Sequence, residues 1–545
     1  VMFLLGEGVD ADAARALVAT YHARGAAEAA LLTIIDRWNT RLSAVEVDTP
    51  DGALNILTNR WLVYQVLSCR FHARSAFYQS GGAFGFRDQL QDVLAFLHFD
   101  AGIARQHIIR AAGRQFPEGD VQHWWHEPVG EGVRTRIEDD RLWLVYAALE
   151  YARVTGDRSI FDATAPLILQ RAPNPDEHSV YETPVRLNEE LSIYEHCTRA
   201  IARTMGTGVH GLPFIGTGDW NDGMDEVGAK GQGESVWLGW FLGSLLEPFA
   251  ALAESRGQTQ QALVYRAHVA KLRDAVEGAW DGEWYRRAYF DDGTPLGSAQ
   301  NTECRIDSIA QTWSVISGLG DPDRARQAMA SVEKWLVERQ HRLILLLTPP
   351  FHRAEPNPGY IKGYVPGVRE NGGQYTHAAL WVVLAQAMLG RGDAAHELLS
   401  FINPIQRSSD RSAVKRYRVE PYAVAADIYS APAHAGRGGW TWYTGAAGWM
   451  YRVTVESLLG IKREGNSLRI DPCVPEQWPR YRVTYRIEGA EYVIDVDNPD
   501  GAGRGVRSLA LDGHPVSGGA ILLEPNSGRH TVRVVLGSLA PATAT

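Results

Sequence analysis

One unit of this chain shows how most of it is built: GTGDWNDGMD at residues 216–225, followed by VWLGWFLGSLLEPFAALAES at residues 236–255. The first part predicts a loop, because glycines break a helix and allow close approach of the backbone. The second part predicts a long helix with an apolar face. A helix that follows a loop of acidic, amide and aromatic residues is therefore the pattern to look for elsewhere in the chain.

The same pattern recurs from residue 89 to residue 459. Helices are predicted at residues 140–155, 188–204, 236–255, 260–279, 304–317, 321–339, 374–389, 394–399 and 440–459. The residue types that carry chemistry fall in the loops between these helices. Because no sequence repeat has a fixed period of about 30–45 residues, we expect a closed α/α barrel rather than a helical solenoid.

Different patterns flank this region. Residues 10–46 predict a helix with an alanine-rich start, and residues 55–69 predict another helix after a turn at residues 49–52. After residue 472, short alternating runs separated by turns predict an antiparallel β-sandwich. The expected fold class is mainly α, with a helical linker at residues 1–48, a catalytic barrel at 49–462, a C-terminal β-sandwich at 463–538 and a tail at 539–545.

The composition excludes several classes of protein. The chain has 545 residues and a formal net charge of −10, which argues against nucleic acid or an anionic membrane as its main partner. No apolar run is long enough to span a bilayer, and no signal peptide is found. Four widely spaced cysteines, Cys69, Cys197, Cys304 and Cys473, predict buried thiols in a reducing compartment and hence a cytoplasmic location.

The loop at residues 216–225 has the residues of a sugar site. Asp219, Asp222 and Asp225 offer an acid for a leaving oxygen and polar groups for hydroxyls, and Trp220 offers a face for a pyranose ring. Two other interpretations stay open. The three acids fit a calcium loop, although their spacing is not that of an EF-hand, and they fit a surface turn with Asx hydrogen bonds.

A glycine-rich loop at residues 80–88 is the second candidate. It is not a P-loop, because it lacks the Lys-Ser/Thr that ends that motif. It is not a dinucleotide-binding fingerprint either, because it lies between two predicted helices, whereas that motif follows a strand. Arg74, Arg87 and Asp88 flank it. Asp88 suits two ring hydroxyls and the arginines suit hydroxyls or phosphate. The alternative for Arg87 is a structural ion pair with an acid of the barrel.

Two further stretches have the features of an anion site. His377 opens a predicted helix after the glycines of residues 370–376, near the positive end of the helix dipole. Thr444 and Gly445 offer a hydroxyl and free backbone N–H groups at another helix start. The alternatives are a core histidine in the first case and a helix N-cap in the second. We predict no metal site.

These four stretches together resemble glycoside hydrolase family 94, the inverting phosphorylases. The resemblance covers nearly the whole chain. Residues 86–92 and 418–422 are most similar to the group formed by 1,2-β-oligoglucan phosphorylases and the C-terminal domains of cyclic β-1,2-glucan synthases. The resemblance implies an (α/α)6 barrel between two β-sandwiches. Residues 1–8 resemble the end of the first sandwich, so we expect that domain to be missing from this chain.

The resemblance also implies roles for individual residues. Asp222 is the expected general acid, Trp220 lines the sugar subsite, and Arg74 and Asp88 hold the glycosyl unit. His377, Thr444 and Gly445 are the expected phosphate ligands, and Arg87, Asp219 and Glu370 complete the substrate-binding set. No cofactor is expected beyond inorganic phosphate as co-substrate. The implied partners are a β-glucan oligosaccharide, a second copy in a homodimer, and a larger membrane-bound synthase.

Two departures from the family pattern accompany this resemblance. The loop between Arg74 and Asp88 is short and lacks the arginine that disaccharide phosphorylases carry there, and Ala426 stands where they carry Gln. Both departures fit a site that is open to longer chains.

The expected reaction needs one protein carboxylate. Protonated Asp222 donates its proton to the glycosidic oxygen while phosphate attacks C1. Asp219 and the phosphate are expected to raise the pKa of Asp222. The alternatives are a hydrolase or transglycosylase, with Glu127 or Asp139 as second carboxylate, a phosphorylase of the cellobiose or cellodextrin type, and a catalytically weak glucan-binding domain.

Overall fold

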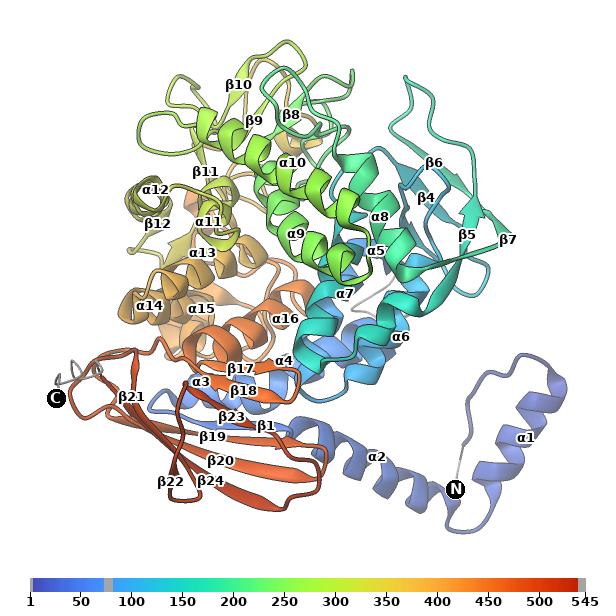
Figure 1. Ribbon diagram of the computed structural model, residues 1–545, viewed down its shortest axis with the longest axis vertical. Coiled ribbons are helices and arrows are strands. Elements are labelled where there is room, and N and C mark those ends of the chain that lie inside the picture. Colours follow the sequence, from blue (N-terminus) through green and yellow to red (C-terminus); the bar gives the residue numbers. More distant parts are fainter. Residues whose placement is uncertain (1–2, 73–81, 538–545) are drawn as a thin grey trace.

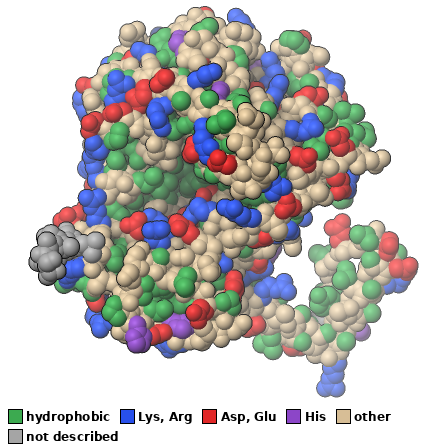
Figure 2. All heavy atoms as spheres, in the orientation of Figure 1, with side chains coloured by type: hydrophobic (Ala, Val, Ile, Leu, Met, Phe, Trp, Pro, Cys, Tyr) green, Lys and Arg blue, Asp and Glu red, His purple; other side chains and the backbone are tan. Residues whose placement is uncertain are grey.

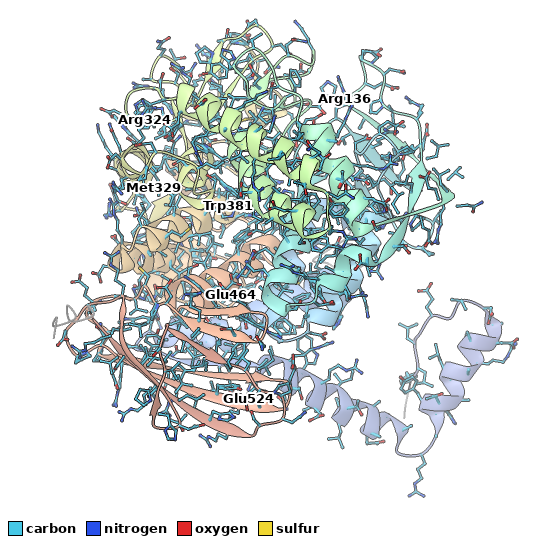
Figure 3. All side chains as sticks on the ribbon, viewed as in Figure 1. Arg136, Arg324, Met329, Trp381, Glu464 and Glu524 are labelled. Atoms are coloured by element: carbon cyan, nitrogen blue, oxygen red, sulfur yellow. The ribbon has the colours of Figure 1, made fainter. Side chains whose placement is uncertain are left out.

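The computed structural model describes residues 3–72 and 82–537, and a ring of six buried helices lies at its centre (Figure 1). These are α5 (Phe86–Asp92), α7 (Leu142–Thr155), α9 (Val236–Ser255), α11 (Ser308–Ile316), α13 (Thr376–Met388) and α16 (Thr444–Arg452). Each contacts the next, and α16 contacts α5, so the ring closes. Large apolar side chains fill its centre, among them the fully buried Trp381 (Figure 3).

A second layer of helices surrounds the ring, and each of its helices contacts an inner one. The outer helices are α4 (Leu62–Val66), α6 (Ala101–Ala112), α8 (Ile193–Thr204), α10 (Thr259–Gly278), α12 (Pro322–Trp335) and α14 (Gly392–Ile402). Apart from the short α4, they are buried on one side, whereas the inner helices are buried on almost every side, which is the expected difference between a surface and a core helix. Figure 2 shows acidic and basic side chains interspersed over one face of this body.

The predicted helices agree with the structure where neighbouring residues set their boundaries. Helix α9 begins and ends as predicted, because the Ser235 side chain accepts a hydrogen bond from the backbone N–H of Leu238 and caps the helix. The helix predicted at 188–204 begins only at Ile193, because a capping box of Ser192 and Glu195 starts it there. The preceding β7 (Val185–Ser192) pairs instead with β5 (Thr164–Leu169).

The sequence predicted a single helix over residues 10–46, but the N-terminal segment contains two. Helices α1 (Ala11–His22) and α2 (Ala26–Leu42) are separated at Gly25, whose φ of 80° suits glycine, and they form an arm that extends from the body (Figure 1). No side chain of either helix is buried. Residues that follow form β1 (Val45–Asp48) and a continuous helical segment of α3 (Gly52–Ile56), η1 (Leu57–Trp61), α4 and η2 (Leu67–His72).

The C-terminal region consists of two sheets. One has the order β1-β19-β20-β24-β21-β22, and the other has the order β17-β18-β23. Their bounds are β17 (Ile461–Glu464), β18 (Ser467–Ile470), β19 (Arg480–Ile487), β20 (Ala490–Asp497), β21 (Val506–Leu511), β22 (His514–Pro515), β23 (Ala520–Leu522) and β24 (Arg529–Leu536). The expectation of a purely antiparallel sandwich was wrong, since β20 and β24 are parallel. The chain visits the second sheet at β23 between them, which provides the crossover that parallel strands need.

Short strands lie in the loops at the end of the ring where the candidate site is found. One four-stranded sheet contains β2 (Phe84–Gly85), β3 (Gln122–Trp125), β4 (Gly132–Thr135) and β6 (Ser179–Glu182). The others are β8 (Glu234–Ser235), β9 (Ala288–Tyr289), β10 (Pro295–Leu296), β11 (Ile306–Asp307), β12 (Val337–Glu338), β13 (Leu343–Ile344), β14 (Leu347–Thr348), β15 (Gln374–Tyr375) and β16 (Asp427–Ile428). Further helical elements include α15 (Arg411–Tyr417) and η9 (Val453–Leu458), which continues α16.

Candidate active site

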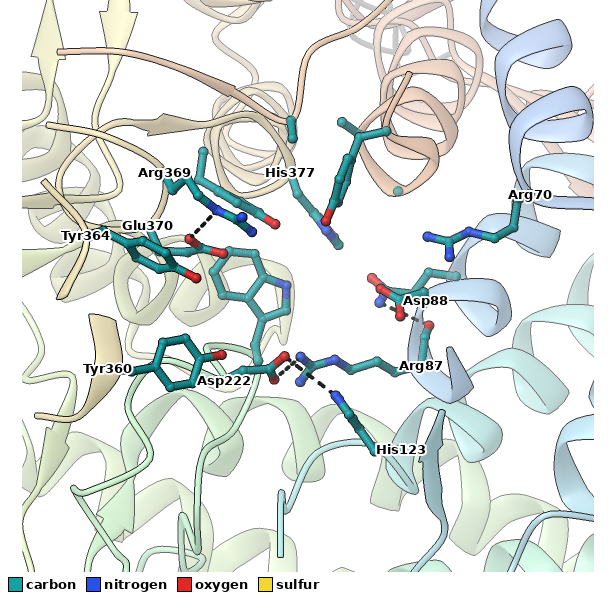
Figure 4. A pocket seen from close by; sticks show the side chains of 17 residues that line it. Arg70, Arg87, Asp88, His123, Asp222, Tyr360, Tyr364, Arg369, Glu370 and His377 are labelled. Atoms are coloured by element: carbon teal, nitrogen blue, oxygen red, sulfur yellow. Dashed lines mark hydrogen bonds and ion pairs between the residues drawn. The ribbon is translucent and has the colours of Figure 1, made fainter. Parts of the chain in front are cut away.

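A cavity of about 190 Å³ lies where the N-terminal ends of α5, α13 and α16 meet the loop at residues 216–225 (Figure 4). It is lined by Arg70, Arg87, Asp88, Gln91, His123, Trp220, Asp222, Tyr360, Tyr364, Arg369, Glu370, Tyr375, His377, Ala426, Tyr443, Gly445 and Ala446. Seven of the predicted site residues are therefore brought together here: Arg87, Asp88, Trp220, Asp222, Glu370, His377 and Gly445. Asp219 and Thr444 do not line the cavity, and Arg74 lies outside the described residues.

The glycines of the 216–225 loop allow the close approach that the sequence predicted. A Cβ at Gly216 would lie 2.1 Å from the carbonyl oxygen of Arg136, and a Cβ at Gly223 would lie 2.8 Å from the Cβ of Ile361. Both positions therefore exclude any larger residue without a shift of the backbone. Between them, the ring of Trp220 is nearly buried and stands edge-on to the rings of Tyr375 and His377.

The three aspartates of this loop face three different partners. Asp219 is fully buried, and its carboxylate accepts hydrogen bonds from Arg287 at 2.5 and 2.7 Å. Asp222 points into the cavity with about a third of its side chain exposed. Asp225 accepts a hydrogen bond from the backbone N–H of Tyr360 at 2.9 Å. Because the carboxylates do not converge, the calcium-loop interpretation was wrong, and so was the expectation that Asp219 contacts substrate.

The carboxylate of Asp222 lies between two cations. It forms an ion pair with the Arg87 guanidinium, and Nε2 of His123 lies 3.6 Å from its Oδ2. Burial raises the pKa of Asp222, but Arg87 and His123 lower it further, so that it ends below its ordinary value. We expected the pKa of Asp222 to be raised, with Asp219 contributing. Its pKa is lowered instead, because Arg87 and His123 outweigh burial, and the charge of Asp219 is paired with Arg287.

His123 is charged in this arrangement. Its Nδ1 lies 2.8 Å from the buried carboxylate of Asp140, and its Nε2 faces Asp222. Burial lowers the pKa of His123, but the two carboxylates raise it well above the ordinary value.

Arg87 forms the structural ion pairs that were its alternative interpretation, and it lines the cavity as well. Its guanidinium lies 2.7 Å from Asp139 and 3.5 Å from Asp140, besides its contact with Asp222. Asp139 is fully buried. Glu127 accepts hydrogen bonds from Arg114 and from the indole of Trp125. Neither of these two carboxylates, the candidates for a hydrolase, lines the cavity.

The opposite wall of the cavity is formed by His377 and the start of α16. Burial lowers the pKa of His377 to about 3, so its ring is neutral at neutral pH. Its Nε2 is buried and has no hydrogen-bond partner among the described residues. A Cβ at Gly445 would lie 3.4 Å from Nδ1 of His377, which places the ring against the start of the helix.

We had expected Thr444 to present its hydroxyl to the cavity, but it does not. The hydroxyl donates a hydrogen bond to Asp92 at 2.8 Å and accepts one from Nε of Arg70 at 3.0 Å. Asp92 is fully buried, and burial raises its pKa to about 7 although Arg70 and Thr444 lower it. Thr444 thus joins Arg70, which lines the cavity, to a buried acid behind the wall.

Several cavity residues were given no role in the predicted site: Arg70, His123, Tyr360, Tyr364 and Arg369. His123 lies in a stretch rich in His and Trp, HWWHE at residues 123–127, which is itself a signal of a polar site. Arg369 precedes Glu370, pairs with it at 3.3 Å and has a φ of 52°, a conformation rare for a residue with a side chain. Burial raises the pKa of Glu370 although Arg369 lowers it.

Outside the cavity, His178, Asp225 and Glu226 each place one possible metal-ligating atom within 4.8 Å of the others. The two ring nitrogens of His178 face different carboxylates, Nδ1 that of Asp225 at 3.2 Å and Nε2 that of Glu226 at 3.7 Å. The ring therefore bridges the two acids.

Comparisons with known proteins identify the family of this chain. Residues 37–460 match the model of the Glycosyl hydrolase 94 superfamily, catalytic domain. The chain is 48% identical over 511 residues to a cyclic beta-(1,2)-glucan synthase of Rhizobium meliloti (strain 1021), covering 93% of this chain and 18% of that protein. It is 31% identical over 500 residues to solabiose phosphorylase of Paenibacillus borealis, covering 90% of this chain and 60% of that protein.

One further relative and one solved structure are similar to the chain. The chain is 30% identical over 547 residues to N,N'-diacetylchitobiose phosphorylase of Vibrio proteolyticus, covering 94% of this chain and 64% of that protein. The solved GH78 family rhamnosidase of Bacillus sp. GL1 shares the fold with a TM-score of 0.53 at 14% identity, over 91% of this chain and 44% of that one. The chain spans less than two thirds of the length of each of these proteins. With more than half of its residues matched, the chain belongs to the Glycosyl hydrolase 94 superfamily.

Proposed function

We propose that this chain is the catalytic part of an inverting glycoside phosphorylase that transfers a glucosyl unit from a β-glucoside to inorganic phosphate. One observation carries the proposal: Asp222 faces, across one cavity, a wall that offers donors to an anion. That wall holds the ring of His377, Gly445 at the start of α16, and Arg70. A helix N-terminus with an arginine and an imidazole beside it is an arrangement suited to phosphate.

The proposed reaction is a single displacement. Protonated Asp222 gives its proton to the glycosidic oxygen as the bond to C1 breaks. Phosphate attacks C1 from the opposite face of the ring and, being an anion, needs no base, so no second carboxylate is required. We assign the binding of the glucosyl hydroxyls to Asp88, Arg87 and Glu370, and the sugar subsite to Trp220, since all four line the cavity. The products are α-glucose 1-phosphate and a chain one unit shorter.

We further propose that the substrate is a β-1,2-linked glucan and that the reaction controls chain length during cyclic glucan synthesis. The 48% identity to a cyclic beta-(1,2)-glucan synthase supports this substrate. The short side chain of Ala426 at the cavity and the half-exposed Tyr360 at its edge fit a longer chain. We also expect a homodimer, and we expect the domain to work on the cytoplasmic side of a membrane-bound synthase.

Two features of the chain bear on that location. All four cysteines are unpaired and buried, as the sequence predicted, and this fits a reducing compartment. Helix α9 is long and apolar enough to cross a membrane, but most of it is buried among the other helices of the ring.

The ring of helices supports an (α/α)6 barrel as the architecture of the catalytic region. Six inner helices contact one another in order, and the outer helices alternate with them along the chain. In this architecture the loops before the inner helices meet at one end, which is where the cavity lies.

The function is tested by incubation with a β-1,2-linked oligoglucan, with and without phosphate. Sugar phosphate formed only in the presence of phosphate is the expected result. Free glucose released without phosphate would indicate a hydrolase, and Asp88 and Glu370 would become the candidates for its second carboxylate, since both line the cavity. Binding without turnover would indicate a sugar-binding domain.

The stereochemistry tests the mechanism independently. Direct attack inverts C1, so a β-glucoside must give an α-phosphate, whereas a double displacement through an enzyme carboxylate retains the configuration. Proton NMR of the early product distinguishes the two, because a sugar phosphate does not mutarotate. A β-phosphate as first product would contradict the single displacement.

A further inference from the structure

The imidazole of His123 lies between two carboxylates that belong to different parts of the fold (Figure 4). Its Nδ1 is 2.8 Å from Oδ2 of Asp140, and its Nε2 is 3.6 Å from Oδ2 of Asp222. His123 belongs to β3, where its neighbour Trp124 pairs with Gly85 of β2 and Val133 of β4. Asp140 lies just before α7 and is almost fully buried. The ring is therefore held from both sides and lines the cavity.

The proposed reaction, on which this inference rests, requires a proton at Asp222. In the structure, however, Asp222 lies against two cations, which stabilise its ionised form. One of them, Arg87, keeps its protons in proteins at any ordinary pH. The other, His123, carries a proton that it is able to give away. Of the two cations that contact Asp222, only His123 is thus a source for the missing proton.

We propose that His123, oriented by Asp140, is a positioning residue that stores the proton of the catalytic acid and passes it to Asp222 when glucoside and phosphate fill the cavity. The charged groups around the ring are Asp140, Asp222 and Arg87, which contacts both carboxylates. The phosphate adds negative charge to the cavity, and this favours a protonated Asp222. The distance of 3.6 Å must shorten by a few tenths of an ångström, as contacts in unliganded sites do when the substrate binds.

The steps balance. The Nε2–H bond of His123 breaks as an O–H bond forms on Asp222, and that O–H bond breaks as the glycosidic oxygen takes the proton. The C1–O bond to the leaving chain breaks, and a C1–O bond to phosphate forms. The attacking hydrogen phosphate loses its own proton, since the sugar phosphate leaves as a dianion, and that proton restores the imidazolium. Asp140 stays ionised throughout and accepts the Nδ1–H hydrogen bond.

The test compares two glucosyl donors on the same enzyme. A β-1,2-oligoglucan has a poor leaving group that needs a proton, whereas 2,4-dinitrophenyl β-glucoside has a leaving group that does not. We expect His123→Gln to lower kcat for phosphorolysis of the oligoglucan by about 10²-fold, the low end of general acid catalysis. With the activated donor we expect a loss of less than about threefold. A role in folding or cavity shape would lower both rates alike, and that outcome would overturn the proposal, as would no loss at all.

His126→Gln is the matched control. His126 lies three residues further along the same segment, packs its ring against Trp124 and does not line the cavity. Both donors should react with this variant as with the wild type. Loss of the oligoglucan activity alone in His126→Gln would mean that any histidine of this segment affects proton transfer, and it would overturn the specific assignment to His123.

Asp140→Asn is a second variant, in case the histidine variant does not fold. It keeps the imidazole and removes only the carboxylate at Nδ1, so we expect an oligoglucan-specific loss of about tenfold. An equal loss on both donors would overturn the proposal. If the wild type forms no sugar phosphate from either donor, the proposed function itself is wrong and this inference falls with it. Phosphorolysis by the wild type, with unselective variants, overturns the inference alone.

Discussion

The two walls of the cavity differ in how their polar groups are satisfied (Figure 4). On the Asp222 wall, Asp222, Arg87 and His123 are paired with one another. On the His377 wall, the ring is neutral and its Nε2 has no partner among the described residues. Buried polar atoms in native proteins are nearly always paired, and an exception calls for an explanation. The difference teaches that the first wall is complete without a ligand, whereas the second is completed by one.

The largest expected effect follows from replacing the acid of the complete wall. Asp222→Asn keeps the shape of the side chain but cannot donate the proton. Phosphorolysis of an oligoglucan should fall by about 10⁴-fold, the upper end of general acid catalysis, because a sugar is a poor leaving group. Steady-state release of sugar phosphate measures this loss.

Glu370→Gln is the control for that experiment. Burial raises the pKa of Glu370, which makes it the rival carboxylate for the role of acid in the same cavity. We expect a smaller loss, spread over binding of the glucan. If Glu370→Gln loses more turnover than Asp222→Asn, the acid has been assigned to the wrong side of the cavity.

The second prediction separates two aspartates of one loop. Asp219→Asn leaves Arg287 buried without its main partner, although Asp307 remains 3.7 Å from it. Removal of one partner from a buried ion pair costs about 3–5 kcal/mol, so the free energy of unfolding should fall by about that amount. Urea or thermal unfolding measures it. Asp225→Asn, in the same loop but partly exposed, should change stability by less than about 1 kcal/mol.

An unchanged stability of Asp219→Asn would contradict the structural role that we give to Asp219 in this loop. It would return Asp219 to the substrate-binding set from which its burial removed it. The loop at residues 216–225 would then have two acids available for chemistry rather than one.

The sequence predicted those features of the fold that depend on neighbouring residues. Helix α9 was predicted to the residue, because its apolar run and its cap are local. The parallel pairing of β20 with β24 and the antiparallel pairing of β5 with β7 were missed, because strand pairing joins segments that are not neighbours in the chain. The break at Gly25 was also missed, since the alanine-rich pattern continues on both sides of it.

The candidate site divides in the same way. The loop alone predicted the close approach at Gly216, and the family resemblance singled out Asp222. The loop by itself did not predict which aspartate faces the cavity, because arginines far away in the chain decide it. Asp219 pairs with an arginine 68 positions away, and Asp222 with one 135 positions away. No local pattern contains that information.

The third prediction concerns the support behind the His377 wall. Burial raises the pKa of Asp92 to about 7, above the value of about 3.9 of an unfolded chain. The folded state therefore holds this proton more tightly, so the stabilisation is full below about pH 4 and is lost as the pH rises to about 7. Relative to wild type, Asp92→Asn should gain up to about 2 kcal/mol of stability between pH 5 and pH 7.

Urea unfolding of both proteins at several pH values measures that difference. Above pH 8 the difference should be constant, because Asp92 is then ionised in both the folded and the unfolded chain. A difference that is flat from pH 5 to pH 8 would mean that Asp92 is ionised throughout, and that Arg70 and Thr444 hold a charge behind the wall.

The smallest expected effect lies at the incomplete wall itself. His377→Ala removes an imidazole that lines this wall, so it should raise the KM for phosphate more than the KM for the glucan. The low pKa of His377 makes it a neutral donor, and a neutral hydrogen bond contributes about 0.5–1.5 kcal/mol, which is about two- to tenfold in affinity. His377→Asn keeps an N–H donor and should lose less. A larger loss, about 30-fold or more, would show that phosphate binding protonates the ring, and the two walls would then differ only until the ligand arrives. An unchanged KM for phosphate would make His377 a core histidine, and the wall would then depend on Arg70 and the start of α16 alone.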